Sequence, residues 1–240
     1  LFVGVWIARY LGPDQFGLLN FALAFTGLFG AVATLGLRGI VVRDIVHDPD
    51  DARLTLGTAA ILQFIGGLLT YLIILVVIAY LRPDDPFARG VVAIMGAMVL
   101  FKVGEVAEYW FESQVQSKYT VWVKNGAFLA LAGIKVVLIL QQAPLTAFVW
   151  AHLAEAGIAA IILLIVMGLR GPGVTKLSVS LQRGGMLLKD GWPLILSAVA
   201  VTVYMKIDQI MLGQMVNDEA VGIYSAAVKI SEVWYFVPMA

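Results

Sequence analysis

The chain has 240 residues, of which 61% are hydrophobic and 13% are charged, and its formal net charge is zero. Soluble domains carry about 25% charged residues, so this composition excludes a water-exposed globule and predicts an all-α, polytopic membrane protein. A chain without net charge offers no basic surface to nucleic acid. The absence of cysteine excludes disulfides and thiolate metal sites.

The first polar interruption of the sequence is a short turn at residues 12–14. Gly12 tolerates unusual φ values, Pro13 has a fixed φ, and the carboxylate of Asp14 can cap a following helix. We therefore predict that one apolar helix ends near Tyr10 and that the next begins near Gln15.

Apolar stretches of membrane-spanning length recur along the rest of the chain, since a spanning helix needs about 20 apolar residues. The sequence begins and ends inside such stretches, so we interpret it as a segment whose first and last spans are truncated. The predicted spans are residues 1–8 (a remnant), 15–37, 54–81, 90–111, 119–140, 145–169, 192–213 and 220–240.

Basic residues are distributed unevenly between alternate connections. The connections after the second, fourth and sixth spans hold Arg38, Arg43, Arg53, Lys118, Lys124, Arg170, Lys176, Arg183 and Lys189, whereas the other connections hold Arg9, Arg82 and Arg89. Cytoplasmic loops are enriched in Lys and Arg. We therefore expect the first set of connections in the cytoplasm and the turn at residues 12–14 outside.

The longest polar break is residues 170–189, RGPGVTKLSVSLQRGGMLLK. Its Gly-Pro-Gly start resists regular structure, and the apolar residues that follow among basic ones predict an amphipathic helix on the cytoplasmic surface. We expect a first transmembrane lobe of six helices at residues 1–169, this amphipathic linker at 170–189, and the start of a second transmembrane lobe at 190–240.

A weak internal repeat supports this division. Residues 205 positions apart keep their chemical class, as in the pairs Asp14 and Glu219 or Gly17 and Gly222. Repeats at this spacing are typical of transporters built from two related halves. We therefore expect the helices that begin at Gln15 and at Ala220 to occupy corresponding places in the two lobes.

Four lysines lie inside predicted spans, where each costs roughly 3 kcal/mol at the centre of a bilayer. They are Lys102, Lys135, Lys206 and Lys229. Such residues need an internal partner or an aqueous cavity. Lys229 is three residues before Glu232 and can pair with it on a helix.

The span at residues 90–111 and its end carry a polar stripe. At 100° per residue the stripe covers about a third of the helix circumference, and its members are Lys102, Glu105, Glu108, Tyr109 and Glu112. Two interpretations are open, the wall of a transport cavity and a structural Lys–Glu network. In both, the stripe faces protein or water and not lipid.

Two further places have polar groups inside spans. His152 and Glu155 share a helix face, which suits a proton relay and equally a packed, hydrogen-bonded pair. Asp208 is another intramembrane carboxylate. No nucleotide-binding loop, zinc-binding His-Glu helix or nucleophile elbow occurs in the sequence, so we expect no cofactor, no metal and no catalytic residue.

Several motifs carry a family resemblance: RYLGPDQFG at residues 9–17, GIVVRD at 39–44, KIDQIMLGQ at 206–214 and VGIYSAA at 221–227. Together they resemble the polysaccharide-biosynthesis (O-antigen-type) flippases of the multidrug/oligosaccharidyl-lipid/polysaccharide exporter superfamily. The resemblance implies a two-lobe transporter in the cytoplasmic membrane. It would turn a polyprenyl-pyrophosphate-linked oligosaccharide to the outer leaflet for O-antigen, capsule or exopolysaccharide assembly, beside membrane lipids and glycan polymerase partners.

The resemblance also implies roles for the intramembrane residues. Substrate would be held in a central cavity by Lys102, Glu105, Glu108, Tyr109, Lys135 and Lys229. The coupling ion, H⁺ or Na⁺, would be carried by Glu105, Glu155 or Asp208.

Three rival functions remain open. A multidrug or cation antiporter of the same superfamily should carry unpaired acids in its cavity, and the intramembrane lysines argue against it. An intramembrane glycan polymerase or ligase usually has catalytic residues on a large external loop, and the expected external loops are short. A membrane scaffold would give no reason for buried charges.

Overall fold

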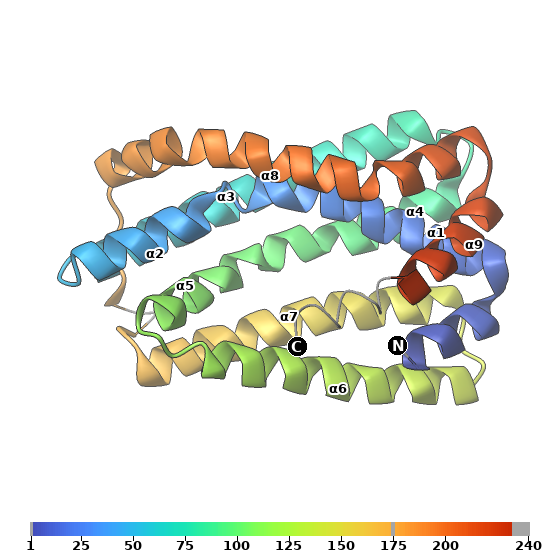
Figure 1. The fold of residues 1–240 in the computed structure, drawn as a ribbon, viewed down its shortest axis with the longest axis horizontal. Coiled ribbons are helices and arrows are strands. Elements are labelled where there is room, and N and C mark those ends of the chain that lie inside the picture. The colour runs from blue at the N-terminus through green and yellow to red at the C-terminus, as the bar shows by residue number, and fades with distance from the viewer. Residues whose placement is uncertain (1, 174–175, 232–240) are drawn as a thin grey trace.

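The computed structural model describes residues 2–173 and 176–231, and every regular element in that part of the chain is a helix (Figure 1). Six of the helical segments are long and apolar enough to cross a membrane. The prediction of an all-α, multi-pass membrane protein is therefore confirmed. The elements are α1 (Phe2–Ala33), α2 (Leu37–His47), α3 (Ala52–Leu81), α4 (Pro86–Gly96), the 3-10 helix η1 (Ala97–Gly104), α5 (Glu105–Ser113), α6 (Lys118–Leu140), α7 (Leu145–Arg170), α8 (Leu181–Met215) and α9 (Asp218–Ser231).

The helices lie lengthwise beside one another, so their connections gather at two ends (Figure 1). Residues 48–51, 114–117, 171–173 and 176–180 lie at one end, on the left in Figure 1, which we call the basic end. Residues 82–85, 141–144 and 216–217 lie at the opposite end. The predicted alternation of connections is thus present in the fold.

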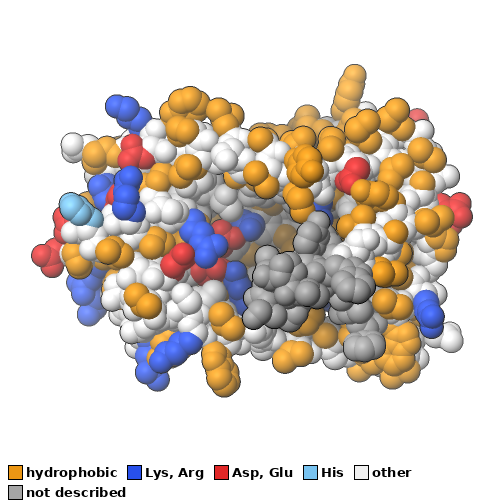
Figure 2. All heavy atoms as spheres, viewed as in Figure 1, with side chains coloured by type: hydrophobic (Ala, Val, Ile, Leu, Met, Phe, Trp, Pro, Cys, Tyr) orange, Lys and Arg blue, Asp and Glu red, His pale blue; other side chains and the backbone are white. Residues whose placement is uncertain are grey.

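The outer surface of the bundle is largely apolar. Hydrophobic side chains cover much of the face in Figure 2, while charged side chains gather toward the basic end and near the middle. Long helices such as α3 and α6 contribute Leu72, Val76, Leu129 and Leu140, each at least half exposed. Such a surface is suited to lipid and not to water.

The predicted turn at residues 12–14 is present as a sharp break inside α1. Gly12 has φ 73° and ψ 172°, outside helical geometry, and Pro13 follows it. The second predicted span does not end at Leu37. It breaks at Gly36, which has φ 61°, and continues as α2 to His47 with Ile40, Val41 and Ile45 buried against its neighbours. Residues 38–47, expected in a loop, are therefore helical.

The span predicted at residues 90–111 is not a regular α-helix. It consists of α4, η1 and α5, and in the 3-10 segment residues three apart are eclipsed. This segment passes very close to its neighbours: a Cβ added at Gly104 would lie 2.6 Å from Cβ of Ala160 on α7, and one at Gly67 on α3 would lie 2.9 Å from the carbonyl oxygen of Val99.

Helix α8 begins earlier than predicted. It starts at Leu181, not at Trp192, and continues through Pro193, so the predicted amphipathic helix and the predicted span are one helix. At its start the Ser180 hydroxyl accepts a hydrogen bond from the Arg183 N–H. The Arg183 guanidinium binds Asp44 of α2 at 3.0 Å and Thr55 of α3 at 3.2 Å. These contacts fix the α8 N-terminus to the basic end of the bundle.

Helices α1 and α9 contact each other through the two glycines that the repeat makes equivalent. A Cβ on Gly17 would lie 1.7 Å from the carbonyl oxygen of Asp218, and a Cβ on Gly222 would lie 2.1 Å from that of Pro13. The repeat offset also pairs Pro13 with Asp218. The contact is therefore reciprocal, as a two-fold relation between the repeat copies requires.

An arginine links α3 to the α8–α9 junction at the same end. Arg82 donates hydrogen bonds to both carboxylate oxygens of Asp218, at 2.7 and 2.9 Å, and to the carbonyl oxygen of Gly213 at 2.8 Å. Its guanidinium carbon lies 4.3 Å from the centre of the Phe21 ring. Because only 10% of the Arg82 side chain is exposed, this bidentate pair is shielded from solvent screening.

The basic-residue asymmetry predicts which end faces the cytoplasm. Single cysteines at Asp50 or Gln116, exposed at the basic end, should react with an impermeant thiol reagent only after the membrane is opened. Cysteines at Asp84 or Gln141, exposed at the opposite end, should react in intact cells. The native chain has no cysteine and provides the unlabelled control. Labelling of position 50 in intact cells would show that the protein has the opposite orientation in the membrane.

The reciprocal glycine contact predicts a specific steric effect. Gly17→Ala and Gly222→Ala each place a methyl group against backbone atoms, which cannot rotate away, and should each lower the unfolding free energy by about 1–3 kcal/mol. Thermal unfolding in detergent measures the loss. Gly133→Ala on α6, with nothing within 4 Å of its new methyl, is the matched control and should be neutral or stabilising. Equal melting temperatures of all three variants would contradict the close contact between α1 and α9.

Candidate functional site

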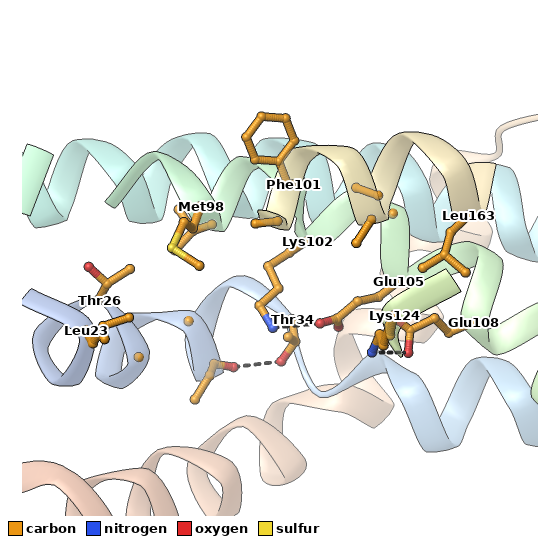
Figure 3. Close-up of a pocket in the computed structure, with 18 of the residues that line it drawn as sticks. Leu23, Thr26, Thr34, Met98, Phe101, Lys102, Glu105, Glu108, Lys124 and Leu163 are labelled. Carbon is orange, nitrogen blue, oxygen red and sulfur yellow. Dashed lines mark hydrogen bonds and ion pairs between the residues drawn. The ribbon is translucent and has the colours of Figure 1, made fainter. Parts of the chain in front are cut away.

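A cavity of about 490 Å³ lies inside the bundle, between α1, the η1–α5 segment and α7 (Figure 3). Small residues leave this space open, including Gly27, Gly30 and Ala31 on α1 and Ala156 and Ala159 on α7. Because residues three or four apart lie on one helix face, each helix turns a strip of small side chains toward the cavity. Leu23, Met98, Phe101 and Leu163 provide larger apolar walls.

One charged pair in the cavity comes from the predicted polar stripe. Lys102 at the end of η1 donates to Glu105 at the start of α5, with 2.6 Å between Nζ and Oε1. Both side chains are partly exposed to the cavity. The tighter winding of η1 still leaves the two side chains adjacent, because an offset of three residues lies on one side of either helix type.

A second pair links two helices at the cavity wall. Lys124 of α6 donates to Glu108 of α5, with 2.7 Å between Nζ and Oε2 (Figure 3). The pattern of basic residues placed Lys124 in a cytoplasmic connection, but it belongs to α6, which begins at Lys118, and its half-exposed side chain stands at the cavity wall. Glu108 could have pointed to Lys124 in the sequence, because an intramembrane carboxylate needs a cationic partner.

The cavity therefore combines balanced charge with apolar walls. Two lysines and two glutamates line it, and every one of the four is in an ion pair. Thr26 also lines it, and the Thr26 hydroxyl is buried without a hydrogen-bond partner among the described residues. Ammonium groups can hold anionic oxygens, and a buried free hydroxyl can bond a polar ligand. Within the described residues, no cluster of three metal-ligating side chains occurs.

Tyr109 and Glu112, the other members of the predicted stripe, do not line this cavity. The Tyr109 side chain is fully buried, where its hydroxyl accepts from Gln63 at 2.7 Å and donates to Glu105 at 3.4 Å. It therefore lies behind the cavity wall and orients Glu105. Glu112 binds Arg38 of α2 at 2.9 Å near the basic end. All four acidic and tyrosine members of the stripe belong to α5 and share one side of that helix, but the cavity meets it only at Glu105 and Glu108.

A second polar cluster joins α6 to α7 outside the cavity. Lys135 is 5% exposed and donates to Glu155 at 2.8 Å, with its Nζ also 3.3 Å from Nδ1 of His152. Because an ammonium group has only donors, Nδ1 is the acceptor and the ring proton is on Nε2. The sequence paired His152 with Glu155 but not with Lys135, since the partner is on another helix.

The two remaining predicted site residues also lie away from the cavity wall. The Lys229 ammonium is 4.6 Å from the centre of the Phe16 ring, and its predicted partner Glu232 is outside the described residues. Asp208 on α8 accepts a hydrogen bond from the Tyr224 hydroxyl on α9. The first contact joins α9 to α1, and the second joins α9 to α8. Neither Lys229 nor Asp208 lines the cavity described above.

Comparison with known proteins gives one match. The model of a family described as polysaccharide biosynthesis protein matches residues 2–235, nearly the whole chain. No curated protein and no solved structure matches the sequence. The family match agrees with the motifs at both repeat copies and with the multi-pass helical fold. The chain therefore belongs to the polysaccharide biosynthesis protein family, the family of O-antigen and oligosaccharide flippases.

Proposed function

We propose that this membrane protein of polysaccharide synthesis is a flippase. Its substrate would be a polyprenyl-pyrophosphate-linked oligosaccharide, moved from the cytoplasmic to the outer leaflet of the cytoplasmic membrane for O-antigen, capsule or exopolysaccharide assembly. The observation that carries the proposal is the cavity in which Lys102 and Lys124 stand among apolar walls inside the bundle.

The chemistry of the substrate explains why such a cavity is needed. A pyrophosphate group cannot enter the hydrocarbon region without compensation, because each uncompensated charge costs several kcal/mol there. Desolvated lysine contacts offset that cost through charge-assisted hydrogen bonds. The same lysines are already held by Glu105 and Glu108, so the carboxylates can displace the substrate and the contacts stay reversible.

The competing functions are less well supported by this cavity. An organic cation would need a carboxylate without a partner, and Glu105 and Glu108 are both bound to lysines. A glycan polymerase or ligase would need a loop with catalytic groups. The described connections at the opposite end, residues 82–85, 141–144 and 216–217, are short. Transport therefore fits better than antiport of organic cations or intramembrane group transfer.

A coupling ion, H⁺ or Na⁺, completes the proposal, with Glu105, Glu155 and Asp208 as its candidate carriers. Glu155 is the strongest candidate outside the cavity because it lies with Lys135 and His152 in a cluster of titratable groups inside the bundle. Glycan polymerases are proposed partners on functional grounds alone.

A leaflet-resolved assay tests the main proposal. The complete chain is reconstituted in vesicles with a polyprenyl-pyrophosphate oligosaccharide, and the fraction exposed to an impermeant glycan-modifying reagent is followed with time. We expect faster exposure than in protein-free vesicles. A rate equal to that of protein-free vesicles, from protein shown to be folded, would overturn the proposal.

Lys102→Ala and Lys124→Ala should each slow flipping by about 10- to 100-fold, the value of one charge-assisted contact of roughly 1.5–3 kcal/mol. Lys102→Arg should retain part of the activity. Lys189→Ala, which removes an exposed lysine from α8, is the matched control. Membrane abundance is measured in parallel, because a purely structural pair would leave a stranded glutamate and reduce abundance instead. Normal flipping by normally abundant Lys102→Ala protein would defeat the cavity assignment.

Glu155→Gln should change the dependence of flipping on the imposed proton or sodium gradient if Glu155 carries the coupling ion. Gln keeps the shape and a hydrogen-bond acceptor for Lys135, but it removes the counter-charge of a lysine that is only 5% exposed. The gradient dependence is therefore compared per amount of folded protein, with abundance measured in parallel. Lys135→Ala leaves the partly buried Glu155 carboxylate without its partner and should destabilise the protein by about 3–5 kcal/mol. An unchanged gradient dependence in Glu155→Gln would assign the cluster to structure alone.

A further inference from the structure

The cavity lysines have partners before any substrate arrives. The ammonium groups of Lys102 and Lys124 lie 2.6 and 2.7 Å from carboxylate oxygens of Glu105 and Glu108. An ammonium group has three N–H donors, and each of these lysines uses one of them on its glutamate. An anion at the remaining donors lies beside the carboxylate, so the two negative groups compete for one positive charge.

We infer that anion binding in this cavity is linked to proton uptake by Glu105 and Glu108. As the anion takes the lysines, the displaced carboxylates bind protons from solvent and become neutral. The identity of the anion, a pyrophosphate, rests on the proposed function. The inference adds that the affinity of the cavity for this anion depends on pH.

Among the described residues, the cavity wall offers the two glutamates no cation besides Lys102 and Lys124. The helices α1, α7 and α8 face the cavity with glycine, alanine, leucine and threonine residues only. Tyr109 on α5 touches Glu105 as a neutral hydrogen-bond donor. Arg38 on α2 is near Glu108, but its guanidinium binds Glu112 at 2.9 Å.

Charge balance then favours the protonated carboxyl groups. The empty cavity holds two positive and two negative side chains and is neutral. Addition of a doubly charged anion would leave an excess of two negative charges among apolar walls, with each displaced carboxylate beside the anion. Like charges at short range in a weakly polar medium favour neutralisation of the carboxylate by a proton. With both glutamates protonated, the loaded cavity is neutral again.

The direction of the pH effect follows from this exchange. Protonated glutamates release the lysines, so the anion binds the protonated form of the cavity. Its affinity should be highest at low pH and fall as the pH rises, by up to about tenfold per pH unit for each proton taken up.

Calorimetry of the complete chain in detergent, with inorganic pyrophosphate as the probe, tests the inference. Titrations in two buffers with different ionisation enthalpies give the number of protons taken up on binding. The double variant Glu105→Gln, Glu108→Gln is compared with the wild type. The free pyrophosphate has the same protonation in both titrations, so the comparison tests whether proton uptake on binding depends on the two glutamates.

We expect the wild type to take up more protons than the double variant, and the variant to bind about tenfold more tightly at pH 8 because its lysines have no competing carboxylate. The difference in affinity should shrink toward pH 6. Glu112→Gln, which removes a carboxylate outside the cavity, is the matched control and should behave as the wild type. The single variants should show intermediate proton numbers, which keeps the test open if the double variant does not fold.

Two failures are distinguishable. Equal proton uptake by the wild type and the folded glutamine variants, with pyrophosphate bound by both, would overturn the linkage and leave the proposed function standing. Absence of pyrophosphate binding by folded wild-type protein would overturn the cavity assignment itself.

Discussion

The structure depends on a constraint that water-soluble proteins rarely face: a charge inside an apolar bundle needs a partner within reach, because neither lipid nor solvent compensates it. Helix α5 meets this constraint by pairing Glu108 with Lys124 of α6, and α6 meets it again by pairing Lys135 with Glu155 of α7. These pairs contribute little net stability, but each one fixes which helices can be neighbours, since a different register would strand two charges.

Close backbone contacts are the second determinant of the arrangement. Lipid tails are as apolar as leucine, so helices in a membrane associate through packing and polar contacts and not through burial alone. The contact between Gly17 and Gly222 brings the two repeat copies together, and Arg82 joins α3 to the same junction through Asp218. Glycine is required on both sides because the carbonyl oxygens of the partner helix occupy the space of a Cβ.

The proposed function rests on the combination of these two features. Small side chains on α1 and α7 leave a cavity where the helices do not meet, and the charged pairs stand at its wall (Figure 3). A cavity whose lysines are already neutralised can stay empty in the membrane without a charge penalty. The exchange of an internal partner for an anionic ligand is the step that we propose for carriage of a pyrophosphate-linked substrate.

The sequence by itself determined the membrane class, the approximate places of the long apolar helices, the turn at residues 12–14 and the polar positions Lys102, Glu105 and Glu108, because hydropathy and helical spacing are local properties. The tertiary structure decided the partners. It moved Lys124 from a connection into the cavity wall and gave Lys135 to Glu155. Such pairings depend on which helices pack together and at what height, and on a 3-10 turn that local periodicity does not reveal.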